Sequence, residues 1–212
     1  MPAPLPPMLL GPAAGALASV GLGGIGIPGL ALALSLGTAV SLATFVLGST
    51  ASAGQPAAVD PLTGTGALAG PGQLSGSLSE GFAANTMSGV LAGAGLLGAG
   101  IPGLGRAYAK VLSQACGFVV GNVMVAPGAA VEGFTTSAPS PLMGIPASPG
   151  QLSPLCLNAL HAEEVRGAFA DELAEALGQF LAAALLMTQA GCVVAAGRAC
   201  TPAATASPGM LL

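Results

Sequence analysis

The chain has 212 residues, of which 6% are charged and 3% aromatic, while 34 are glycine and 18 are proline. An ordinary soluble domain has about 25% charged residues, so this composition and a mean hydropathy of +0.82 exclude a solvated disordered chain and a typical free monomer. The net charge of −4 with four basic residues excludes nucleic-acid binding, which needs clustered Lys and Arg to neutralise phosphates.

The N-terminal 59 residues carry no charge, because the first charged side chain is Asp60. A secretory signal peptide has a basic N-terminal region, which this segment lacks. Residues 29–48 form an uncharged run of twenty that is long enough to cross a bilayer as a helix. We therefore expect this part of the chain to be covered by lipid or by a larger assembly.

The segment GIPGL occurs at residues 26–30 and again at residues 100–104. Proline disfavours the helical conformation in the residue before it, and glycine relaxes the backbone further. We expect each copy to form a break between two apolar helices that pack together as a hairpin. The two copies should occupy equivalent structural positions.

Other segments recur in the same order along the chain. FVLG at 45–48 returns as FVVG at 118–121, and PGQL at 71–74 returns at 149–152. Self-similarity at a nearly fixed period is typical of duplicated units. Each unit is predicted to contain apolar helices, a short strand that is Val-rich in the second and third units, and a Pro/Gly/Ser/Thr-rich segment. The predicted units are 1–74, 75–152 and a shorter 153–212.

The Pro/Gly/Ser/Thr-rich segments at 49–74 and 126–152 are too long for ordinary loops. They keep Val, Leu, Ile, Phe and Met, unlike a solvated linker. We expect extended arms that lie on neighbouring subunits and become ordered when another chain supplies a strand or a groove. The predicted fold class is mainly α with short β elements, built from repeated helix–strand–extended-arm units within a symmetric assembly.

The third unit has the clearest helical pattern. Ser153 and Pro154 predict the helix start, with serine as N-cap and proline in the first turn, and Gly191 predicts the end. Apolar residues that recur every four positions predict one buried face: Val165, Phe169, Leu173, Leu177, Leu181 and Leu185. The acidic residues on the opposite, polar side are Glu164, Asp171 and Glu175.

Three segments are candidate membrane spans by length and composition, near 29–48, 87–105 and 176–197. Small residues recur at four-residue spacing, as in Ala33/Gly37/Ser41. Such residues let helices approach closely in lipid, and they also suit helix packing at the axis of a symmetric oligomer. The surroundings of the apolar faces, lipid or protein, stay open at this point.

The sequence predicts no catalytic, cofactor-binding or metal site. GLGGIG at 21–26 matches a dinucleotide-binding glycine pattern, but no strand is expected before it and no acidic residue follows at the required distance. The acidic residues of the third unit are expected on a solvated helix face rather than in a cleft: Glu163, Glu164, Asp171, Glu172 and Glu175. His161 is expected to be a surface histidine.

The four cysteines lack the CxxC pairing of a zinc or redox site: Cys116, Cys156, Cys192 and Cys200. Buried free thiols and disulfides both stay open. A hairpin over the intervening VVAAGRA segment could bring Cys192 and Cys200 together.

The order of an apolar helix, a V-x-V-x-x-G run and a Pro/Thr/Ser-rich tail resembles small hydrophobic virion proteins of tailed phages and contractile injection systems. The resemblance covers VMVAPGAAVEGFTTSAPSPLMGIPASPGQL at 123–152 and VVAAGRACTPAATASPGML at 193–211. It implies a non-enzymatic structural subunit of the tail tip, tube or baseplate, located in the virion or injection particle and able to contact a membrane. The expected partners are copies of this chain, other particle subunits and membrane lipid, with no nucleic acid and no small-molecule substrate. The alternative is a small integral membrane or pore-forming protein with about three apolar spans.

Overall fold

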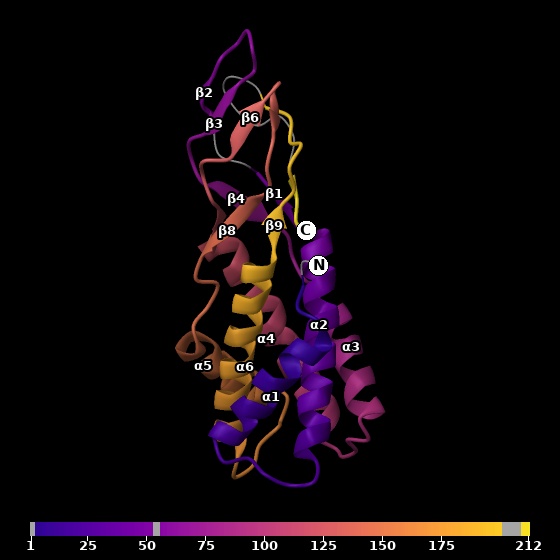
Figure 1. The fold of residues 1–212 in the computed structure, drawn as a ribbon. Coiled ribbons are helices and arrows are strands. Elements are labelled where there is room, and N and C mark those ends of the chain that lie inside the picture. Colours follow the sequence, from indigo (N-terminus) through magenta and orange to yellow (C-terminus); the bar gives the residue numbers. More distant parts are fainter. Residues whose placement is uncertain (1–2, 53–55, 201–208) are drawn as a thin grey trace.

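The computed structural model describes residues 3–52, 56–200 and 209–212. The chain is mainly α-helical with short β-strands, as the sequence predicts. The helices form a bundle at one end of an elongated molecule, and the strands lie at the other end (Figure 1).

Six helices form three antiparallel hairpins. In each hairpin the first helix has 14 residues and the second has 22. The helices are α1 (Pro6–Ser19), α2 (Ile27–Gly48), α3 (Glu80–Gly93), α4 (Ile101–Asn122), α5 (Pro149–Ala162) and α6 (Ala170–Gly191). Each helix packs against the next, and α6 packs against α1, so the bundle closes into a ring. At this closure, Ser19 Oγ donates a hydrogen bond of 2.9 Å to Gln179 Oε1.

The connections within the three hairpins have the same backbone structure. In each, the first helix ends in a Schellman motif, in which one residue adopts a positive φ and the N–H groups of that residue and of the next one donate to free helix carbonyls. The positive-φ residues are Gly21 at 78°, Gly95 at 73° and Glu164 at 57°. The long hydrogen bonds of the motifs are Leu22 N to Leu17 O at 3.1 Å, Leu96 N to Leu91 O at 3.1 Å and Val165 N to Leu160 O at 2.9 Å.

The two GIPGL segments lie at the start of α2 and of α4. Gly26 and Gly100 are the N-cap residues, with φ and ψ of −79° and −16° in the first and −82° and −13° in the second. The proline of each segment lies in the first helical turn, where its missing N–H has no helical partner to lose. The segments therefore occupy equivalent positions, which confirms that prediction.

Six short strands form a closed sheet above the helices. The strands are β1 (Thr50–Ala51), β4 (Gly72–Ser75), β5 (Val123–Val125), β8 (Ser140–Gly144), β9 (Val193–Val194) and β10 (Gly209–Met210), in the order β10-β1-β4-β5-β8-β9. Val193 and Leu212 exchange backbone hydrogen bonds of 3.0 and 2.8 Å, which joins the two ends of the sheet into a barrel. Closure removes the unpaired edges that would otherwise recruit another chain.

A second sheet covers the far end of the molecule. It contains β2 (Pro56–Val59), β3 (Gly66–Leu68), β6 (Ala130–Glu132) and β7 (Thr135–Thr136), in the order β2-β3-β6-β7. The segments 49–74 and 126–152, expected as arms on neighbouring subunits, thus pair within the chain. The arm prediction was wrong because β-pairing partners lie in distant parts of this same sequence.

The third unit contains a helical hairpin instead of the single long helix that the sequence predicts. Ser148, not Ser153, is the N-cap of α5, and its N–H donates to Gln151 Oε1 at 2.9 Å in a capping box. Pro154 lies inside α5. The turn at 163–169 interrupts the four-residue apolar pattern, because Glu164 adopts the positive φ that ends α5.

The PGQL repeats do not occupy equivalent positions. The first copy lies in and before β4, whereas the second forms the first turn of α5. The predicted boundary between 152 and 153 therefore falls within a helix. The predicted span 87–105 includes the turn between α3 and α4, so it is not one helix.

Candidate functional site

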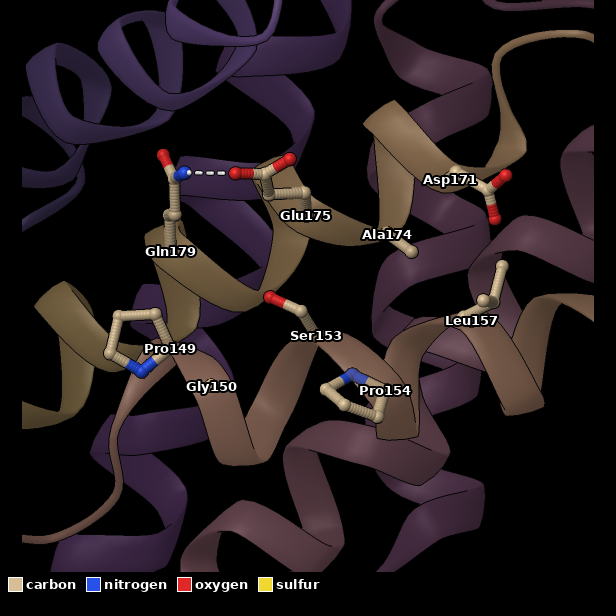
Figure 2. Close-up of a pocket in the computed structure, with 9 residues that line it drawn as sticks. All are labelled: Pro149, Gly150, Ser153, Pro154, Leu157, Asp171, Ala174, Glu175 and Gln179. Atoms are coloured by element: carbon tan, nitrogen blue, oxygen red, sulfur yellow. Dashed lines mark hydrogen bonds between the residues drawn. The ribbon is translucent and has the colours of Figure 1, made fainter.

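An open groove of about 460 Å³ lies between α5 and α6 (Figure 2). Asp171, Glu175 and Gln179 recur every four residues on α6 and line one wall. Pro154 and Leu157 of α5 contribute the opposite wall. Gln179 Nε2 donates to Glu175 Oε1 at 3.2 Å. The groove is acidic on one side and apolar on the other.

The remaining acidic residues of this region do not join that groove. Glu163 lies in the turn between α5 and α6, where Arg106 Nε of α4 donates to its Oε2 at 2.6 Å. This pair is partly exposed, so it contributes about 0–1 kcal/mol to stability. Glu164 is exposed in the same turn, and His161 is exposed in the last turn of α5. The structure therefore separates these side chains rather than gathering them into a cleft.

The GLGGIG segment at 21–26 is the connection between two helices. The element before it is α1, whereas a dinucleotide site follows a strand. Its glycines serve the turn, because Gly21 and Gly24 adopt φ of 78° and 132°. This geometry accounts for the glycine pattern without a ligand.

A buried polar contact joins α2 to α4 in the centre of the bundle. The Thr38 and Tyr108 hydroxyl oxygens lie 2.6 Å apart, and both side chains are buried. Burial raises the pKa of Tyr108, so its phenol stays protonated. The sequence analysis did not identify this pair, although Tyr108 is the only tyrosine of the chain and lies within an apolar segment.

The four cysteines are buried. Burial raises the pKa values of Cys116 and Cys156 to about 12, and both are free thiols in the main core. Cys192 belongs to the same core, whereas Cys200 packs in a separate cluster between the distant strands. The suggested pairing of Cys192 with Cys200 is therefore wrong. Protonated, buried thiols are poor nucleophiles and metal ligands.

Arg198 is buried between the two sheets, with 3% of its surface exposed. Its Nη2 donates to Ser140 Oγ at 2.7 Å, while Nε and Nη1 have no hydrogen-bond partner in the part of the chain that the structure describes. Burial lowers the pKa of this guanidinium. Its contacts join β8 of the barrel to β7 of the second sheet, and the sequence contains no signal for this role.

The outward surface of α1 and α2 carries no charged side chain and is called here the uncharged face. Its exposed large apolar residues are Leu5, Met8, Leu10, Leu32, Val40 and Leu47. Two apolar grooves border α2: one of about 270 Å³ beside residues 3–6, and one of about 330 Å³ beside α3. A surface of this kind is typical of a contact with protein or lipid.

Among the residues that the structure describes, no group of three or more His, Cys, Asp or Glu side chains could hold a metal ion. No protein-family model, curated protein or solved structure matches this chain.

Proposed function

We propose that this chain is a non-enzymatic structural subunit of a phage-like tail or injection particle, and that its three hairpins descend from one duplicated unit. The supporting observation is the closure of three similar units around one axis. Each unit contributes a 14-residue helix, a 22-residue helix and two strands of the barrel. We infer from this order an approximate threefold arrangement of the helices and the barrel, which would suit an axial position next to a threefold-symmetric neighbour.

The uncharged face gives a second reason to place the chain in an assembly. Leu47 is 72% exposed and Met8 is 54% exposed, and no charged residue lies on α1 or α2 to keep this surface soluble. Covering such side chains stabilises an assembly by about 25 cal/mol per Å² of apolar surface removed from water. A neighbouring subunit would provide this cover.

Expression of the chain alone and together with the products of its neighbouring genes tests the proposal. We expect the chain alone to aggregate or to need detergent, and to become soluble in a complex with a tube, hub or baseplate protein. In that complex we expect one copy per threefold-symmetric neighbour. A stable, water-soluble monomer that binds none of these products would contradict the proposal.

An integral membrane protein is the second candidate function. The observation that favours it is that α2 and α6 are each 22 residues long and apolar enough to cross a bilayer. Against a fully embedded bundle, α4 carries Arg106 and Lys110 on its exposed side, where lipid would penalise charge. Carbonate extraction of expressing cells separates the candidates, because release into the soluble fraction excludes an integral membrane protein.

A further inference from the structure

The three hairpin connections lie together at the end of the bundle that is farthest from the sheets (Figure 1). We call these segments, residues 20–26, 94–100 and 163–169, the distal loops. A Cβ at Gly26 of the first loop would lie 3.8 Å from Leu96 Cδ2 of the second loop. A Cβ at Gly103, in the first turn of α4, would contact Glu163 and Val165 of the third loop. The first and second distal loops therefore lie side by side, and the third lies beside the start of α4.

Each distal loop exposes one large apolar side chain. Ile25 is fully exposed, Leu97 is 87% exposed and Phe169 is 66% exposed. Each loop also packs apolar residues against the core, and these are Val20 and Leu22, Ala94 and Leu96, and Val165. The loops thus already have their packing residues, and the exposed side chains are additional to them.

The fold does not require the exposed apolar residues. The three loops share one backbone structure, so their residues can be matched position by position. The counterparts of Ile25 are Ala99 and Ala168, those of Leu97 are Gly23 and Arg166, and those of Phe169 are Gly26 and Gly100. Small or charged residues therefore support the same loop, which indicates that the large apolar residues serve a contact outside the chain.

The exposure of single apolar side chains on separate loops, two of which are uncharged, favours lipid over a protein partner. The three side chains lie exposed on glycine-containing turns that the Schellman hydrogen bonds hold in place. Insertion into acyl chains favours each exposed side chain separately, whereas a protein interface needs a continuous complementary surface. The first two loops are uncharged; the third carries Glu163, which pairs with Arg106, and the exposed Glu164 and Arg166.

We propose that the distal loops insert Ile25, Leu97 and Phe169 into a lipid bilayer, so that the helical end of the molecule is a membrane-contacting tip. The lipid contact extends the proposed function as a particle subunit. It rests on that function in one respect, that the tip points away from the particle. The lipid contact itself depends only on the distal loops. The acidic residues near this end give no attraction to anionic headgroups, so binding should be driven by apolar insertion.

Flotation with phosphatidylcholine vesicles tests the lipid contact. The chain is used in whichever state is soluble, either in the complex with its particle partner or alone, so failure of the proposed function does not prevent the measurement. Ile25→Asp, Leu97→Asp and Phe169→Asp should each lower the vesicle partition coefficient at least about tenfold. The matched control is Leu62→Asp, because Leu62 is 91% exposed in the turn between β2 and β3 at the opposite end.

The expected result is binding to phosphatidylcholine that 0.5 M salt does not weaken, lost in the three loop variants and kept in Leu62→Asp. Equal loss in the control would show unspecific adhesion and overturn the proposal. It is also overturned if the parent does not float, or if the loop variants instead dissociate an oligomer in light scattering. Circular dichroism of each variant verifies that the bundle remains folded. Variants that no longer float but still form the complex with the particle partner would show that the lipid contact and the particle assembly use different parts of the chain.

Discussion

The close packing of α5 against α6 predicts opposite effects for the same substitution at two helix positions. Gly178 lies in the interior of α6, and a Cβ placed there would meet Ser153 Oγ and lie 2.6 Å from Ser153 N and 2.8 Å from its Cα. Gly117 lies in the interior of α4, and a Cβ there would have nothing within 4 Å. Both glycines have helical backbone conformations, so only their surroundings differ.

Alanine in a helix interior is favoured over glycine by about 1 kcal/mol. At Gly117 this gain is unopposed, so Gly117→Ala should raise the melting temperature by about 2–4 °C for a chain of this size. At Gly178 the backbone of α5 must move away, and overpacking of this kind costs about 1–3 kcal/mol or more. Because Ser153 contributes backbone atoms and cannot rotate aside, we expect a net loss of about 2 kcal/mol and a fall of about 4–8 °C.

Thermal unfolding followed by far-UV circular dichroism measures both shifts under one buffer condition. The parent protein and Gly178→Ser, which retains the clashing Cβ, complete the series. The packing argument is refuted if Gly178→Ala melts at or above the parent temperature, or if both alanine variants shift in the same direction.

Three further predictions concern the hairpin turns and the buried polar groups. Glu164→Gly should raise the free energy of unfolding by about 1 kcal/mol, because glycine adopts φ of 57° without strain. Gly95→Ala, at φ of 73°, should lower the free energy of unfolding by a similar amount. Chemical denaturation measures both changes, and changes of the same sign would contradict the strain argument. Tyr108→Phe should cost about 1–2 kcal/mol in the same assay, because it leaves a buried hydroxyl without its partner, and an unchanged midpoint would contradict this. The contribution of Cys116 and Cys156 to stability should be constant below pH of about 8.5 and fall as the pH rises toward 12, because the unfolded thiols ionise while the folded ones, with pKa values raised to about 12, do not. Urea midpoints at several alkaline pH values should then fall less steeply in the Cys116→Ala/Cys156→Ala variant than in the parent.

Local features of the fold were predictable from the sequence. The apolar run 29–48 becomes α2 almost unchanged, and the Val-rich segments contain β5 and β9. The equivalence of the two GIPGL segments was also predictable, but each segment begins the second helix of its hairpin instead of forming the break, because Ile27 and Ile101 are helical although a proline follows each of them. The absence of charged residues before Asp60 also predicted an apolar surface, and this is the uncharged face of α1 and α2.

The division of the third unit was not predictable from its apolar pattern. The four-residue spacing runs through the turn at 163–169, and the residue with positive φ is Glu164 where the other two hairpins have glycine. No local signal therefore marked the end of α5. The tertiary contact between Arg106 and Glu163 is also absent from any sequence pattern, since 57 positions separate the two residues.

The sequence by itself determined the classes of element, the absence of charge over the N-terminal 59 residues and the matching starts of α2 and α4. Only the tertiary structure decided that the expected arms pair into a closed barrel, that α6 meets α1, and that Arg198 is buried beside Ser140. The physical reason is the range of the interactions. Backbone preferences and hydrophobic periodicity act over a few residues, whereas the barrel pairs β1 with β10 across most of the chain.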